Sequence, residues 1–200
     1  MTTLSDAWRH NGMVDLDGFG DESMWEALRD EAHACAPSAF ERRFDKVELY
    51  RDGSMMSPQR CRAHRGGDAV RALAHNHELL ELARSTTGMD SLVPARYGYK
   101  YYERGSFMGV HRDAARCSIT FTFALTDNLA EMSWLPGLRE ESNESVRTFI
   151  EAHGHLPEEA ERLPISFCSM KGFDGYNIPH WRMPFEDDFG ILGTVCYFDL

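Results

Sequence analysis

The chain has 200 residues, of which 42% are hydrophobic and 26% charged, a composition typical of a globular protein with one substantial core. A net charge of −11 argues against non-specific binding to nucleic acid or anionic membranes. No apolar stretch is long enough to span a bilayer, and residues 1–13 lack the apolar core of a signal peptide. Five scattered cysteines without a C-x-x-C pair indicate reduced thiols, so we expect a cytoplasmic protein.

Two helices are predicted in the N-terminal part, about 12–90. Asp21 is a suitable N-cap for the first helix, whose apolar residues recur at helical spacing. Asp68 can cap the second helix, and Gly88 is expected to end it. A short alternating piece at 47–51 between the helices indicates a strand.

The pattern changes to β structure in a core region of about 92–199. Segments that alternate or are rich in β-branched and aromatic residues predict strands. These segments are 96–102, 117–125, 164–170 and 190–198. Residues 172–175 (GFDG) predict a turn. Helices followed mainly by strands favour an α+β protein with a mainly β core, a small barrel or jelly roll with the helices packed outside, as one domain over residues 1–200.

Residues 129–163 interrupt the strands and are expected to form a lid or insertion with a short helix at 143–153. At 200 residues the chain is expected to leave little room for a separate recognition domain. Substrate specificity is therefore expected from this insertion and from a loop at 52–66. Trp134 in the insertion is a candidate substrate contact.

His111 and Asp113 form the most informative motif, because they stand two positions apart at the end of an aromatic run. In an extended chain, residues at this spacing project from the same face. An imidazole and a carboxylate on one face are two parts of the two-histidine, one-carboxylate triad that holds non-haem Fe(II). His180 is the best candidate in the last forty residues for the third ligand.

The order of these parts resembles the Fe(II)/2-oxoglutarate-dependent dioxygenases, in particular the prolyl-hydroxylase-like and phytanoyl-hydroxylase-like branches. The resemblance covers about residues 12–199. It implies a double-stranded β-helix with Fe(II) held by His111, Asp113 and His180. It also implies that 2-oxoglutarate and O2 are consumed while a C–H bond of a small-molecule or amino-acid-like substrate is oxidised. Related halogenases have a small residue at the carboxylate position, so Asp113 favours hydroxylation or another oxidation.

One feature of that family is missing. Its members usually carry an arginine nine or ten residues after the distal histidine, which binds the far carboxylate of 2-oxoglutarate, whereas residues 189–192 here read FGIL. A buried carboxylate needs a cationic partner. The candidates, in order, are Arg182, Arg116 and Lys100, with the Tyr102 hydroxyl as an additional hydrogen-bond donor. Arg104 flanks the site and is a candidate contact for an anionic substrate group.

Three alternatives remain open from the sequence. His153 and His155 form an H-x-H pair that could replace one ligand. The protein could be a cupin-like Fe(II) oxygenase or oxidase that does not use 2-oxoglutarate, for which the missing arginine is the main support. It could also be a non-catalytic β-barrel that binds a small molecule. The oligomeric state is not indicated.

Overall fold

The computed structural model describes residues 3–129, 131–158 and 160–200. The helices are α1 (Leu4–Asn11), α2 (Glu22–Cys35), α3 (Asp68–Ala74), α4 (His77–Thr87) and α5 (Asn143–His153), with 3₁₀ turns η1 (Ala36–Ser38) and η2 (Pro136–Leu138). The strands are β1 (Met13–Asp15), β2 (Phe40–Phe44), β3 (Glu48–Leu49), β4 (Met55–Met56), β5 (Gln59–His64), β6 (Leu92–Glu103), β7 (Phe107–His111), β8 (Ile119–Ala124), β9 (Met132–Trp134), β10 (Glu161–Leu163), β11 (Met170–Phe173), β12 (His180–Arg182) and β13 (Phe189–Asp199).

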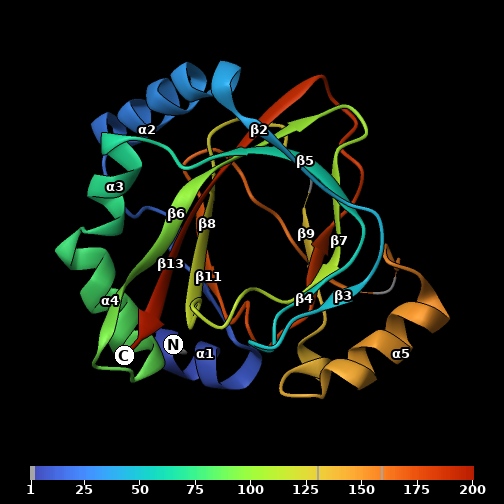
Figure 1. The fold of residues 1–200 in the computed structure, drawn as a ribbon. Coiled ribbons are helices and arrows are strands. Elements are labelled where there is room, and N and C mark those ends of the chain that lie inside the picture. The colour runs from blue at the N-terminus through green and yellow to red at the C-terminus, as the bar shows by residue number, and fades with distance from the viewer. Residues whose placement is uncertain (1–2, 130, 159) are drawn as a thin grey trace.

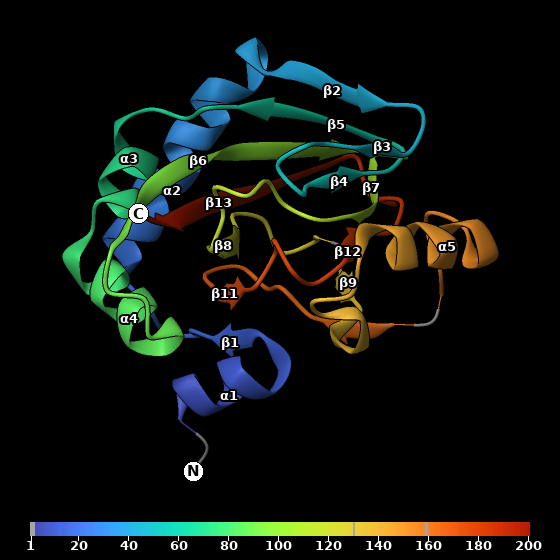
Figure 2. The same cartoon turned by 60° about the horizontal axis from the view of Figure 1, so that its bottom comes forward.

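Within the described residues, eleven strands form one curled sheet in the order β1-β11-β8-β13-β6-β5-β7-β12-β9-β10, with β2 paired to β5. The curl brings β8 and β11 opposite β7 and β9 (Figure 1), and β12 pairs with both β7 and β9. Helices α2, α3 and α4 cover the outside of β6 and β13, while α5 lies at the opposite end (Figures 1 and 2). The predicted architecture, a mainly β barrel with helices packed outside, is confirmed. No helix in the described part of the chain is long and apolar enough to cross a membrane.

Alternation along β6, β8 and β13 separates a helix-covered face from an interior face. Tyr99 and Phe123 belong to the outer core that packs under the helices, together with Trp25 of α2. The intervening residues, such as Lys100 and Thr122, line an interior cavity. The period-two pattern of the sequence therefore assigns each side chain of these strands to a face.

The second predicted helix is wrong as a single element, because the structure contains α3 and α4 with a break at His75 and Asn76. The Asn76 side chain accepts a hydrogen bond from the Leu79 backbone N–H at 3.0 Å, which begins a new helix. The predicted end at Gly88 is confirmed, with the glycine in the left-handed conformation at φ 75°. The cap at Asp21 is also confirmed.

The strand predicted at 164–170 and the turn at 172–175 are wrong in position, because β11 covers Met170–Phe173. Gly172 pairs with Val14 of β1 on one side and with Phe121 of β8 on the other. A Cβ at Gly172 would lie 2.6 Å from the Phe121 ring, so this glycine permits close packing within a strand. Its role depends on partners far away in the sequence.

Two segments expected to lie outside the barrel contribute strands to it. The ends of 129–163 form β9 and β10, which pair with each other, and β9 also pairs with β12. The helix predicted inside this segment is confirmed as α5. Most of the loop expected at 52–66 forms β4 and β5, and β5 pairs with β6.

Glu31 on α2 links the helical layer to the sheet. Its carboxylate accepts hydrogen bonds from the Tyr99 hydroxyl at 2.7 Å and from the backbone N–H groups of Ala69 (2.7 Å) and Val70 (3.1 Å). Burial alone would raise the pKa of Glu31, but these hydrogen bonds hold the pKa below its usual value. A carboxyl with a lowered pKa stabilises the fold above its unfolded-state pKa, and this contribution is lost as the pH falls.

Glu31→Gln is therefore expected to lower the free energy of unfolding by about 1 kcal/mol at pH 7, since the amide is a weaker, neutral acceptor. The difference from the wild type should shrink as the pH falls towards 4. Urea unfolding at the two pH values measures this, with the exposed Glu26→Gln on the same helix as control. An equal loss in both variants, or a loss that does not depend on pH, would contradict the expectation.

Candidate metal centre

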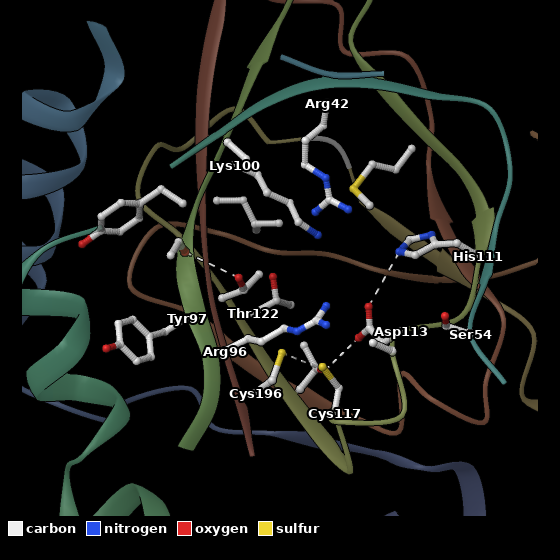
Figure 3. Close-up of a pocket in the computed structure, with 18 of the residues that line it drawn as sticks. Arg42, Ser54, Arg96, Tyr97, Lys100, His111, Asp113, Cys117, Thr122 and Cys196 are labelled. Atoms are coloured by element: carbon white, nitrogen blue, oxygen red, sulfur yellow. Dashed lines mark hydrogen bonds and ion pairs between the residues drawn. The ribbon is translucent and has the colours of Figure 1, made fainter. Parts of the chain in front are cut away.

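His111, Asp113 and His180 meet at one rim of the interior cavity. His111 ends β7 and His180 begins β12, and the two are direct cross-strand partners. Asp113 follows in the loop after β7, and its Oδ1 lies 4.0 Å from His111 Nε2 and 3.9 Å from His180 Nε2. All three potential ligand atoms lie within 4.8 Å of one another, and Figure 3 shows His111 and Asp113 facing the cavity. This is the spacing of donors around one metal ion.

Both imidazoles are held in the form that binds a metal. His111 Nδ1 lies 2.9 Å from the Gly109 carbonyl, and His180 Nδ1 lies 2.9 Å from the Ile178 carbonyl. A carbonyl only accepts, so each Nδ1 carries the proton and donates, which leaves the Nε2 lone pair for a metal. Burial lowers the pKa of both histidines, which favours neutral rings. His111 Nε2 is buried and has no hydrogen-bond partner among the described residues.

Asp113 is the candidate anionic ligand. Thr120 of β8 donates a hydrogen bond to Asp113 Oδ2 at 2.7 Å, and the Asp113 backbone N–H donates to the Gly175 carbonyl at 2.8 Å. Burial alone would raise the pKa of Asp113, but the neighbouring His180, His111 and Lys100 hold it below its usual value. The group is therefore a carboxylate whose Oδ1 faces the histidines. Two neutral imidazoles and one carboxylate fit a divalent transition metal.

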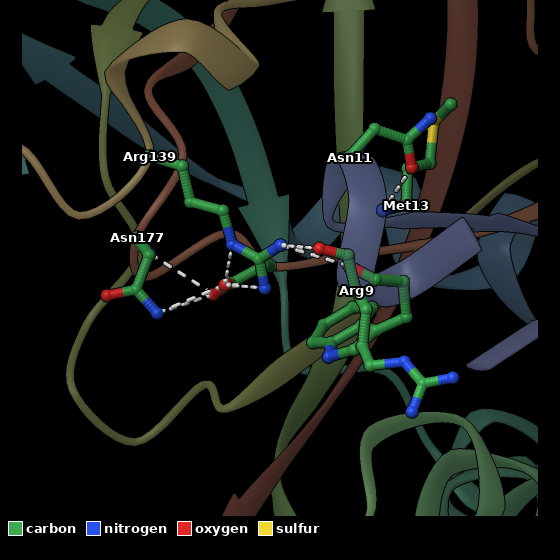
Figure 4. Close-up of polar contacts among 7 residues, drawn as sticks. Arg9, Asn11, Met13, Arg139 and Asn177 are labelled. Carbon is green, nitrogen blue, oxygen red and sulfur yellow. Dashed lines mark hydrogen bonds and ion pairs between the residues drawn. The ribbon is translucent and has the colours of Figure 1, made fainter. Parts of the chain in front are cut away.

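A turn at 174–178 supports two of the three ligands. It contributes the carbonyls of Gly175 and Ile178, which bind Asp113 and His180. The buried Asp174 carboxylate holds this turn by accepting hydrogen bonds from Arg139 Nε at 3.2 Å and Asn177 Nδ2 at 3.0 Å (Figure 4). The candidate ligands are thus oriented by a second layer of hydrogen bonds, which nothing local in the sequence identifies.

Gly175→Ala should weaken metal binding without removing a ligand. A Cβ at Gly175 would lie 2.2 Å from Asp113 Oδ2, so the carboxylate must move. We expect the affinity for Mn(II) to fall by about tenfold or more, as is typical when a ligand loses its support. Calorimetric titration measures this, and Gly137→Ala, where a Cβ would meet nothing within 4 Å, is the control. Unchanged affinity in Gly175→Ala would mean that the ligand tolerates displacement.

The cavity next to the triad has a volume of about 1080 Å³. It is lined by Lys100 and Tyr102 of β6 and by Arg182 of β12, three of the residues considered for co-substrate binding. Arg182 is fully buried, and its guanidinium lies 5.6 Å from the centre of the Tyr102 ring. Lys100 is partly buried and makes no hydrogen bond or ion pair with another described residue. Burial lowers the pKa of Lys100, while the nearby Asp113 opposes this shift.

Three other candidate contact residues do not line this cavity. Arg116 is exposed in the loop before β8. Arg104 is exposed and forms an ion pair with Asp188 at 3.0 Å. Trp134 is buried in β9, beside His180 in the sheet, and does not extend over the cavity as a lid. Of the described residues in 129–163, Met132 alone lines the cavity.

The alternative ligands His153 and His155 lie away from the cluster. His153 is exposed and stacks on Phe149 at 4.6 Å between ring centres. His155 lies beside Phe107 at 5.7 Å. Neither belongs to the group of side chains that could hold a metal in the described part of the chain.

Two arginines that the sequence did not single out also face the cavity, Arg42 of β2 and Arg96 of β6 (Figure 3). The signal for Arg96 was present, because it alternates in phase with Lys100 and Tyr102. Arg42 could not be found in this way, since β2 was not predicted.

No protein-family model matches the sequence, and no curated protein sequence matches it either. Solved structures do match. The epimerase SnoN from nogalamycin biosynthesis, described as non-haem and α-ketoglutarate-dependent, aligns with a TM-score of 0.70 at 16% identity over 98% of this chain and 81% of SnoN. A Pseudomonas putida prolyl-4-hydroxylase aligns with a TM-score of 0.62 at 13% identity over 98% of this chain and 97% of that protein. HygX from Streptomyces hygroscopicus, solved with nickel, 2-oxoglutarate and hygromycin B, aligns with a TM-score of 0.64 at 11% identity over 96% of this chain and 84% of HygX.

These alignments confirm the double-stranded β-helix predicted from the sequence. The fold of this chain is the one found in 2-oxoglutarate-dependent oxygenases, and it extends over nearly the whole chain. At these identities the likeness concerns the fold. The argument for activity therefore rests on the residues around the cavity.

Proposed function

We propose that this protein is an Fe(II)- and 2-oxoglutarate-dependent dioxygenase that oxidises a C–H bond of a small-molecule or amino-acid-like substrate, most simply by hydroxylation. The observation that carries the proposal is the convergence of His111, Asp113 and His180, with two neutral imidazoles and one carboxylate, on the rim of a large cavity. Iron bound by these residues would supply O2 activation coupled to the oxidative decarboxylation of 2-oxoglutarate. The presence of Asp113 favours oxidation over halogenation.

Lys100 is our first choice for the residue that binds the far carboxylate of 2-oxoglutarate. Its strand position supports this role, because Arg96 on the same strand lies level with Thr120, the hydrogen-bond partner of Asp113, whereas Lys100 lies further along the strand, level with Ala124. Arg182, the first choice from the sequence, already interacts with the Tyr102 ring and hydroxyl. We therefore propose that Arg182 orients Tyr102 and that Lys100 holds the co-substrate.

The surrounding side chains would keep the reacting groups dry and in place. Met108, Met132 and Phe173 line the cavity near the histidines, and all three are buried. An apolar wall excludes water and strengthens the interaction between a cation and a bound carboxylate. The Thr120 hydroxyl keeps Asp113 Oδ2 engaged, which leaves Oδ1 for the metal.

A second candidate function is a cupin-like Fe(II) oxygenase or oxidase without 2-oxoglutarate. Its support is the absence of a cation at 189–192, where the structure has Gly190 opposite Tyr102 in the sheet. Among proteins of similar fold, SnoN and HygX were solved with the small molecules nogalamycin RO and hygromycin B, and a Trichoplax adhaerens prolyl hydroxylase was solved with a peptide fragment. The reduced cysteines support a cytoplasmic location.

The deciding experiment is anaerobic addition of Fe(II) and 2-oxoglutarate to the metal-free protein. Bidentate binding of the co-substrate is expected to produce a weak visible charge-transfer band, and succinate release in air should depend on 2-oxoglutarate. Fe(II) binding without the band would favour the second candidate. No Fe(II) binding would contradict both and favour a non-catalytic binding module. A substrate screen coupled to succinate release would then identify the substrate.

A further inference from the structure

The cavity has the opposite charge to the protein as a whole. The chain carries a net charge of −11, yet the residues that line the cavity include eight lysines or arginines against two aspartates. One of the two aspartates is the metal ligand Asp113. A concave surface with one sign of charge attracts ligands of the opposite sign. A divalent metal ion and a 2-oxoglutarate dianion have charges that cancel. The excess of cationic side chains in the cavity therefore remains after both have bound.

Three of these cations lie on one face of the sheet. Arg42 is paired with Cys61 across β2 and β5, and Lys100 is paired with Ala63 across β5 and β6. Direct cross-strand partners share a face, and Arg96 shares the face of Lys100 through the period of two. Figure 3 shows the three side chains extending into the same cavity towards the space beside Asp113.

Arg42 and Arg96 are not needed by the proposed reaction or by the fold. The far carboxylate of 2-oxoglutarate requires one cation, the role given to Lys100. Within the described residues, neither arginine makes a hydrogen bond or an ion pair, whereas Arg43, which follows Arg42 on β2, pairs with Asp45 at 2.8 Å. An unpaired guanidinium group that faces a cavity is suited to bind an anion, because it can donate two parallel hydrogen bonds to a carboxylate or phosphate.

The wall around Arg42 is aromatic. Phe40 and Phe44 stand two residues before and after Arg42 on β2, and both line the cavity. Phe40 is 54% exposed, which is unusual for a phenylalanine and is explained if a ligand covers it. This part of the cavity therefore offers a cation to the anionic group of a ligand and an aromatic surface to its apolar part.

We propose that the substrate is an anionic small molecule, with a carboxylate or phosphate held by Arg42 and Arg96 and an apolar or aromatic body that contacts Phe40 and Phe44. This inference rests on the proposed function for the identification of the ligand as a substrate. The anion site itself depends only on the residues of β2 and β6.

The test compares probes of similar shape and different charge. Phenyl phosphate, phenylacetate and neutral phenylacetamide are titrated calorimetrically into metal-free protein, and again into protein loaded with Mn(II) and 2-oxoglutarate. We expect at least one anion to bind about tenfold or more tightly than phenylacetamide in both states. The tighter of the two anions identifies the phosphate or the carboxylate as the preferred group.

Variants assign the binding to the two arginines. Arg42→Gln and Arg96→Gln should each weaken binding of the preferred anion by about tenfold and leave the affinities for phenylacetamide and 2-oxoglutarate unchanged. Arg43→Gln, on the same strand with its side chain on the other face, should change none of them. Failure of both anions to bind, equal binding of charged and neutral probes, or the same loss in Arg43→Gln would overturn the proposal.

Two outcomes separate this inference from the proposed function. If Arg42→Gln and Arg96→Gln weaken 2-oxoglutarate binding instead, these arginines serve the co-substrate and the inference is wrong while the proposed function stands. If the anion binds through both arginines but Fe(II) does not bind at all, the anion site is supported and the proposed dioxygenase function is contradicted.

Discussion

His111→Ala is expected to weaken Fe(II) binding by more than about 100-fold and to abolish 2-oxoglutarate-dependent succinate formation. Loss of a group that only supports a ligand typically weakens metal binding by about 10–100-fold, so loss of a ligand itself should weaken it further. The reason lies in the geometry of the triad. His111 Nε2 is buried and has no hydrogen-bond partner in the described part of the chain, and the other two candidate ligands cannot replace its lone pair. Anaerobic titration with Fe(II), followed by the charge-transfer band, measures the loss.

The matched control is His153→Ala, which removes an exposed imidazole of the rival H-x-H pair. This variant should bind Fe(II) and turn over like the wild type. His180→Ala should behave like His111→Ala. Equal Fe(II) affinity in the wild type and in both triad variants would remove the triad from the mechanism, whatever the activity measurement gives.

Lys100→Met is expected to raise the KM for 2-oxoglutarate by about 10–100-fold, because a carboxylate bound away from bulk water would lose its cation. Methionine has a similar length and suits an apolar wall, so the fold should persist. Fe(II) affinity should stay within a few-fold of the wild type, since Lys100 is not a ligand. Initial rates of succinate release against 2-oxoglutarate concentration give the KM.

Arg116→Met and Arg182→Met complete this experiment. Arg116 is exposed outside the cavity, so its variant should leave the KM unchanged. Arg182 contacts Tyr102, and its variant should affect stability more than the KM. A normal KM in Lys100→Met combined with a raised KM in Arg182→Met would return the anchoring role to Arg182, the order of preference that the sequence alone suggested.

The two charge patterns of the molecule have separate consequences. The acidic exterior disfavours anionic polymers and membranes, whereas the basic cavity favours small anions that can enter it. An acidic chain can have a basic cavity because alternation along β2 and β6 directs Arg42 and Arg96 inward while Arg43 points outward. The net charge of the whole chain therefore does not indicate the charge of a ligand that this cavity would bind.

The sequence by itself determined the features that depend on short spacing. The two-residue spacing of His111 and Asp113 placed both at the end of one strand region, and the period of two along 96–102 placed Lys100 on the same face as Tyr102. Capping residues located the beginning of α2 and the end of α4, and α5 was located from its pattern. Each of these is decided by backbone geometry over a few residues.

Only the tertiary structure decided which distant residues meet. His180 faces His111 because β12 pairs with β7 in one register, and Arg42 reaches the cavity because β2 is added to β5. Arg116, with the same charge, lies outside. Strand register and barrel closure depend on contacts between segments far apart in the chain, so spacing along the sequence cannot rank such candidates. Local spacing thus specifies the pair His111 and Asp113, whereas the position of His180 and the choice among the candidate cations depend on long-range packing.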